Sequence, residues 1–186
     1  MMLRQEQGCM DKKGFTINMG VFVSPENVEI DGKNVRMGVT KKTSIPLFVD
    51  SDYNLGYIFG SFLACGIANL TDYRKSTRGI TIFRAKPGLP HDFSKLKKVI
   101  LEVFNLKARE NENSLYVYNV PLTKLFYEFG IRKGRHLPEK YFVSHEGFNS
   151  GLLDGLEDFH ALEEDPRTKR VVSLYVKKLY DKLTKK

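Results

Sequence analysis

Two short segments restrict the possible folds of this chain more than any other feature. Residues 55–66 read LGYIFGSFLACG and residues 148–158 read FNSGLLDGLED, so both combine large apolar side chains with regularly spaced glycines. A helix that is apolar on nearly every side is usually buried. Because glycine costs a helix about 1 kcal/mol relative to alanine, its repeated use in both segments requires a compensating contact.

The spacing of the small residues predicts what that contact is. Gly60 and Ala64 lie one turn apart in the first segment, preceded by Gly56, and Gly151 and Gly155 have the same spacing in the second. Each helix would therefore carry a strip with almost no side chains, on which another backbone can pack closely. We predict that the two helices pack together through these strips, with Gly60 and Gly151 at equivalent positions. The alternative is two unrelated core helices.

Charge and composition narrow the class of partner. The net charge of +8 on 186 residues favours an anionic partner, with nucleic acid first and a membrane surface second. The absence of any run of 18 apolar residues predicts that no segment spans a membrane. The first residues lack the apolar centre of a signal peptide, and two cysteines are too few for a disulfide framework. We therefore expect an intracellular protein.

The pattern along the chain predicts a mixture of strands and helices. Before the first glycine-rich segment, residues 15–23 predict a strand, and Asp31-Gly32 predicts the turn of a hairpin. Residues 69–78 are polar and basic, and the strongest strand pattern of the chain lies at residues 114–120. With a further strand at residues 80–85 and the helices between them, the order suggests an internal duplication whose second copy is short.

Three local features give the chain a resemblance to the LAGLIDADG homing endonucleases, particularly the endonuclease parts of inteins. Residues 55–66 and 148–158 are similar to the two motifs of that family, and residues 129–138, FGIRKGRHLP, are similar to the basic link before the second motif. The resemblance covers about residues 45–186. It implies an α+β fold made of a pseudo-twofold duplicated αββαββα repeat. The two motif helices would form its centre, and antiparallel saddle-shaped sheets would lie in the major groove of DNA.

The resemblance also divides the chain into four parts. Residues 1–44 form a β-rich lead-in or leader, and residues 45–131 form the first LAGLIDADG-like repeat. Residues 132–146 form a basic linker, and residues 147–186 form a second, shortened repeat. Each of the two repeats would supply a sheet that meets DNA.

Basic and aromatic residues of the first repeat and the linker are the expected DNA contacts. In the first repeat they would lie on or beside the sheet. The alternative interpretation of the basic segment in the first repeat is a solvated loop. The expected nucleic-acid-binding residues are Tyr73, Arg74, Lys75, Arg78, Arg84, Lys86, Arg132, Lys133 and Arg135.

The catalytic positions depart from the family pattern. In the family, each motif helix ends with an acidic residue before a glycine, and the two acids hold divalent metal. Alignment on Gly60 and Gly151 places Cys65 and Leu156 at these positions. Neither side chain is an oxygen ligand of the kind that Mg²⁺ prefers.

Three nearby carboxylates are the remaining candidates for catalysis. Glu157 and Asp158 follow the second acidic position immediately and could bind the metal if the helix end shifts by one residue. Asp154 lies about one turn earlier, and its alternative role is a structural hydrogen bond or salt bridge. If the chain is active, its expected cofactor is Mg²⁺.

These patterns predict a double-stranded DNA-binding protein of the homing endonuclease type and leave site-specific cleavage open. One alternative is a catalytically inactive module that binds DNA or protein. The other is one piece of a split intein or split endonuclease, in which a second chain completes the shortened half.

Overall fold

The chain has a mixed α+β structure with antiparallel sheets, as the sequence predicts. The computed structural model describes residues 14–23, 28–37, 43–73, 76–85, 91–129, 137–141 and 145–159. The α-helices of these residues are α1 (Tyr53–Cys65), α2 (Ser94–Phe104), α3 (Val120–Tyr127) and α4 (Glu146–Asp158).

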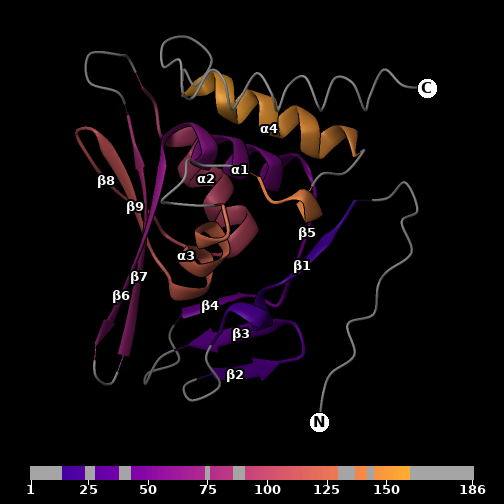
Figure 1. The fold of residues 1–186 in the computed structure, drawn as a ribbon, viewed down its shortest axis with the longest axis vertical. Coiled ribbons are helices and arrows are strands. Elements are labelled where there is room, and N and C mark those ends of the chain that lie inside the picture. Colours follow the sequence, from indigo (N-terminus) through magenta and orange to yellow (C-terminus); the bar gives the residue numbers. More distant parts are fainter. Residues whose placement is uncertain are drawn as a thin grey trace.

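A four-stranded antiparallel sheet follows α1 directly, because Gly66 both ends the helix and begins the first strand. The elements from α1 to α3 occur in the order αββαββα, and the strands lie in the order β6-β7-β9-β8. The helices lie on one side of this sheet (Figure 1). The strands are β6 (Gly66–Tyr73), β7 (Ser76–Arg84), β8 (Arg109–Asn111) and β9 (Ser114–Tyr118).

Side-chain caps set the start of several helices. The Asp52 carboxylate accepts a hydrogen bond from the Leu55 amide at 2.8 Å at the start of α1. The side chains of Asn119 and His145 accept equivalent bonds at the starts of α3 and α4. Such caps satisfy amides that have no partner within the helix. The Asn119 cap sets the start of α3 at Val120.

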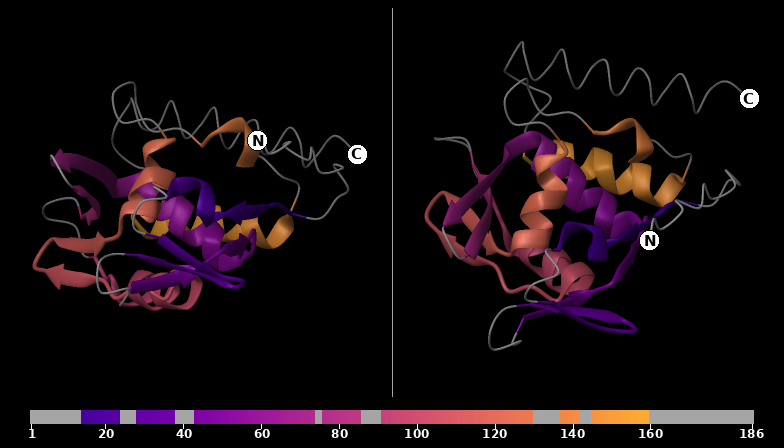
Figure 2. Two further views of the ribbon diagram at one scale, coloured as in Figure 1. Left: turned by 90° about the horizontal axis from the view of Figure 1, so that it is seen from below. Right: turned by 60° about the horizontal axis from the view of Figure 1, so that its bottom comes forward.

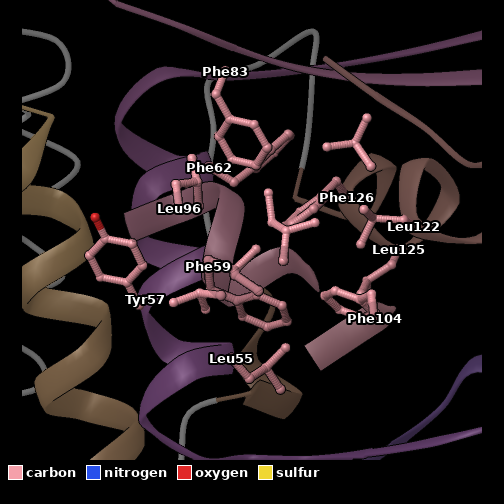
Figure 3. Packing of buried hydrophobic residues seen from close by; sticks show 14 of the residues in the cluster. Leu55, Tyr57, Phe59, Phe62, Phe83, Leu96, Phe104, Leu122, Leu125 and Phe126 are labelled. Carbon is pink, nitrogen blue, oxygen red and sulfur yellow. The ribbon is translucent and has the colours of Figure 1, made fainter. Parts of the chain in front are cut away.

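The hydrophobic core lies between the sheet and the helices and is rich in phenylalanine. Phe62 of α1 stacks on Phe126 of α3, with ring centroids 4.1 Å apart, and Phe59 meets Phe129 edge to face at 4.8 Å. Figure 3 shows the core rings of α1 and α3 turned toward one another while the Tyr57 hydroxyl points to α4. α1 thus uses one side for this core and another for its contact with α4.

The β-rich lead-in packs on the same core. Buried Met19, Val35 and Ile45 belong to one continuous cluster with the side chains of α1. The predicted hairpin is confirmed, with Gly32 at φ +46° in its turn, a value that glycine accepts readily. The lead-in contains β1 (Thr16–Asn18), a 3-10 helix (Met19–Phe22), β2 (Val28–Asp31), β3 (Asn34–Met37), β4 (Thr43–Pro46) and β5 (Phe48–Asp50).

One strand prediction needs correction, and one open alternative is decided. The strand predicted over residues 15–23 ends at Asn18, because the Asn18 side chain accepts a hydrogen bond from the Gly20 amide at 2.9 Å and caps a 3-10 helix. The polar and basic segment at residues 69–78 belongs largely to the β6–β7 hairpin. Its outward positions are polar, so the segment has the composition of a loop even though its backbone is paired.

Candidate nucleic-acid interface

The two glycine-rich helices α1 and α4 lie side by side (Figures 1 and 2) and touch through their backbones. A Cβ atom added at Gly56 would overlap the carbonyl oxygen of Phe148, and one added at Gly60 would overlap that of Leu152. In return, Gly151 and Gly155 lie against the backbone of α1 in the same way. Only glycine fits at these positions, which is the contact that the spacing of the small residues predicts.

The register of this helix seam differs from the prediction by one turn. Gly56 of α1 meets the backbone of residues 148 and 152 of α4. Gly151 of α4 meets residues 53 and 57 of α1, which lie at the same offsets from Gly56 as residues 148 and 152 lie from Gly151. Gly60 and Gly155 are related in the same way. The predicted equivalence of Gly60 with Gly151 is therefore wrong. The pair that corresponds to Gly151 and Gly155 is Gly56 and Gly60, rather than Gly60 and Ala64.

A tyrosine–aspartate ladder fixes this register. The hydroxyl of Tyr53 donates to Asp154 Oδ2 at 2.5 Å, and the hydroxyl of Tyr57 donates to Asp158 Oδ2 at 2.7 Å. Lys95 of α2 lies over the Tyr57 ring, 4.0 Å from its centroid, and its Nζ is 3.2 Å from Asp158 Oδ2. The two tyrosines are one turn apart, as are the two aspartates. Sliding α4 by one turn would leave one tyrosine and one aspartate without a partner in the ladder, so only the observed register makes both bonds.

The ladder shifts the ionisation of its members. Burial, followed by the hydrogen bond to Asp158, raises the pKa of Tyr57 well above its ordinary value. The hydrogen bond to Asp154, followed by burial, raises the pKa of Tyr53. For Lys95, burial lowers the pKa, but the hydrogen bonds to Tyr53 and Asp158 outweigh it, and the net pKa is raised. The folded protein therefore holds these protons more tightly than the unfolded chain does.

We expect the ladder to lose its stabilising effect at high pH. A group whose pKa is raised on folding contributes stability that is fully present below its unfolded pKa, here 10.0 for Tyr57, and lost as the pH rises above it. Unfolding by urea between about pH 9 and about pH 12 should show a steep fall in stability. Tyr57→Phe should lower the stability at neutral pH and flatten that fall. A variant that keeps the full pH dependence would contradict this assignment.

Two of the three candidate catalytic carboxylates hold the helices together through hydrogen bonds. Asp154 and Asp158 both accept tyrosine hydrogen bonds, which matches the structural alternative for Asp154. Glu157 is exposed. Leu156 is buried, and the buried Cys65 thiol donates to the Ser61 carbonyl at 3.3 Å.

Asp154 and Asp158 are held by tyrosine hydrogen bonds at the seam rather than arranged as a set of Mg²⁺ ligands. Within the described part of the chain, no three histidine, cysteine, aspartate or glutamate side chains come together as metal ligands. Mg²⁺ is usually held in near-octahedral geometry by one or two carboxylates together with water and substrate phosphates. The carboxylate of Asp158 is already engaged by a tyrosine and a lysine. No catalytic step through a metal is therefore derived for this seam.

The outer face of the sheet, the face turned away from the helices, is the second candidate site. The pairing register and the alternation with buried residues define it. For example, Phe83 is fully buried, so its neighbours Ile82 and Arg84 belong to the outer face. The outer face comprises Ile67, Asn69, Thr71, Arg78, Ile80, Ile82, Arg84, Arg109, Asn111, Tyr116 and Tyr118.

The charge on this outer face has one sign. Arg78, Arg84 and Arg109 are exposed, and no aspartate or glutamate shares the outer face among the described strand residues. The nearby acids occupy the opposite face: Asp72 accepts from the Thr77 hydroxyl, and Glu110 pairs with Lys97 of α2 at 2.9 Å. The sheet therefore separates positive charge on the outside from acids on the helix side.

The structure describes only part of the predicted DNA-contact set. Arg78 and Arg84 lie on the outer face, and the Tyr73 backbone pairs with Ser76 at the end of the β6–β7 hairpin. The other predicted contacts lie outside the described residues; they are Arg74, Lys75, Lys86, Arg132, Lys133 and Arg135.

Sequence reasoning missed several residues of the outer face. Tyr116 and Tyr118 were visible as alternating positions of a strand, but nothing in the sequence indicated which side of that strand is open. Pairing with β7 places them outward, beside Ile82 and Ile80. The other missed polar residues are Asn69, Thr71, Arg109 and Asn111, which two separate hairpins bring to the same surface.

No protein-family model matches the chain, and no curated protein shows significant similarity to it. Among the described residues, no helix is long and apolar enough to cross a membrane.

Proposed function

We propose that this chain is a double-stranded DNA-binding protein of the LAGLIDADG homing endonuclease type, in which the outer face of the sheet enters the major groove. The observation that carries the proposal is the composition of that face. Three arginines lie among amide, hydroxyl and isoleucine side chains, and no carboxylate of the described strands lies on this face. The major groove is about 12 Å wide and admits a two-stranded β-ribbon, which the β6–β7 hairpin resembles.

The side chains of the outer face suit both parts of DNA recognition. Arginine binds phosphates and also binds guanine through two hydrogen bonds, whereas asparagine makes the equivalent pair with adenine. Arg78 and Asn69 occupy neighbouring strands, with Asn69 opposite Ile80. Isoleucine side chains can contact thymine methyl groups. The outer face therefore offers complements to several base edges as well as to the backbone.

We further propose that the seam does not cleave DNA. Cys65 supplies no oxygen ligand, and Asp154 and Asp158 accept hydrogen bonds from tyrosines. In the observed register Leu156 corresponds to Ser61 rather than to Cys65. These contacts support the alternative of a catalytically inactive binding module. A second chain that completes the shortened repeat remains a prediction, because residues 160–186 lie outside the described part of the chain.

Salt dependence tests the DNA proposal. Each phosphate neutralised by the protein contributes about −0.9 to the slope of log affinity against log salt concentration. If the three arginines of the outer face each neutralise one phosphate, affinity for a pool of random duplexes should fall about 40-fold between about 50 mM and about 200 mM salt. Fluorescence anisotropy measures this directly. An affinity that is insensitive to salt would refute groove binding.

A cleavage assay on plasmid DNA tests the proposal that the seam does not cut DNA. We expect a plasmid library incubated with Mg²⁺ or Mn²⁺ to remain intact. Nicks that disappear in Glu157→Gln would contradict the proposal, because Glu157 is an exposed carboxylate in the last turn of α4, at the end of the seam.

A further inference from the structure

We propose that the β8–β9 side of the outer face binds single-stranded nucleic acid by stacking unpaired bases on Tyr116 and Tyr118. The proposal goes beyond the binding of duplex DNA. Its ligand is a phosphate chain whose bases are separated from one another, and it can hold or fail independently of groove binding.

The two tyrosines form an aromatic platform in the middle of the sheet. Both belong to β9, whose neighbours are β7 on one side and β8 on the other. Tyr118 is 55% exposed, and Tyr116 is partly exposed. Opposite them on β7 lie Ile80 and Ile82, which are also partly exposed, so the aromatic rings continue into an apolar strip. An apolar strip of this kind on an exposed sheet favours flat, weakly hydrated ligands such as bases.

The spacing of the rings distinguishes separated bases from a duplex. Residues two apart on a strand lie about 6.7 Å from each other. Stacked bases on one strand of a duplex are about 3.4 Å apart, half this distance. The two rings therefore match the bases of a stretched single strand, and they cannot both stack on adjacent bases of an intact duplex.

Charged and polar neighbours complete the site. The guanidinium carbon of Arg109 lies 5.8 Å from the centroid of the Tyr118 ring, where it can also reach a phosphate. Asn111 Nδ2 donates to the Tyr116 hydroxyl at 3.2 Å and restrains that ring. Arg84 lies at the end of the neighbouring strand, opposite Ser114. Stacking on aromatic side chains beside a positively charged groove is how sequence-tolerant single-strand binding generally works.

Charge complementarity selects this ligand over a protein partner. The described residues of the outer face carry three arginines and no acid. A polyanion compensates this charge along its whole length. A protein partner would need an acidic patch that matches these arginines.

The test uses the full chain and fluorescently labelled oligo(dT), oligo(U) and a blunt duplex. Tyr118→Leu, alone and with Tyr116→Leu, should weaken binding of the single strands about tenfold or more, whereas Tyr118→Phe should retain it because the ring is kept. Tyr127→Leu, which removes a similarly exposed tyrosine from α3, is the matched control and should have no effect. Circular dichroism confirms that each variant is folded.

The outcomes separate the two proposals. Loss of single-strand binding in the leucine variants that exceeds any loss of duplex binding by about tenfold supports the stacking site. Equal affinity for oligo(dT) and oligo(U) would show that the site recognises bases and phosphates. A preference for oligo(U) would show that the site also recognises the 2′-hydroxyl group of RNA. If neither oligonucleotide binds, or if the double leucine variant binds as well as the parent, the stacking site is refuted. If single strands bind and duplexes do not, the proposed function fails and this inference stands.

Discussion

Gly151→Ala should lower the free energy of unfolding by about 3 kcal/mol, whereas Gly147→Ala on the same helix should change it by less than about 1 kcal/mol. The added methyl group at Gly151 would overlap the Tyr53 carbonyl oxygen and approach the Tyr57 amide nitrogen at 2.9 Å. Both are backbone atoms of α1, so they can give way only if the helices separate. At Gly147 the nearest atom is the Cε1 of the His145 ring at 3.3 Å, which can move.

Urea unfolding followed by circular dichroism measures this difference. The comparison is matched because both glycines lie on α4, one turn apart, and alanine improves the intrinsic helix propensity at both. If the two substitutions had equal effects, the close approach of the backbones would not be what holds the helices together.

A second pair of substitutions tests the twofold relation within the seam. Gly56 and Gly151 occupy equivalent places, so either alanine alone already pushes the helices apart at the same level. The effect of Gly56→Ala combined with Gly151→Ala on stability should therefore be smaller than the sum of the single effects. Strict additivity would indicate two independent contacts.

Removing two arginines from the outer face should weaken duplex binding about tenfold or more and make it less sensitive to salt. In Arg78→Ala with Arg84→Ala, the slope of log affinity against log salt concentration should become shallower by about 1.8, since each lost phosphate contact accounts for about 0.9. The two arginines lie on the same strand and face, so they can meet one groove together.

Lys33→Ala with Lys98→Ala is the control for net charge. It removes the same number of positive charges, but from the β2–β3 turn and from an exposed side of α2. This control should leave the slope nearly unchanged. If both double variants lost affinity equally, binding would depend on overall charge rather than on the outer face, and the groove-binding proposal would fail.

The pairing of α1 with α4 was predictable from sequence because glycine repeated at a one-turn spacing destabilises an apolar helix unless a second backbone packs against it. Their register was not predictable. Gly56, Gly60 and Ala64 follow one another at a spacing of one turn. Gly151 and Gly155 could therefore correspond either to Gly56 and Gly60 or to Gly60 and Ala64. The choice is made by Tyr53–Asp154 and Tyr57–Asp158, hydrogen bonds between residues 101 positions apart in the chain.

The sequence by itself determined the mixed composition of the fold, the hairpin at Gly32 and the close contact of the glycine-rich helices, because each depends on local spacing or backbone conformation. Only the tertiary structure decided which carboxylates are engaged and which side of the sheet is open. The carboxylate of Asp158 has the same chemistry whether it binds a metal or a tyrosine. Tyr118 has the same place in the alternating strand pattern whether its side chain faces the core or the solvent. Those outcomes depend on which distant strand or helix lies beside them, and local pattern carries no information about that neighbour.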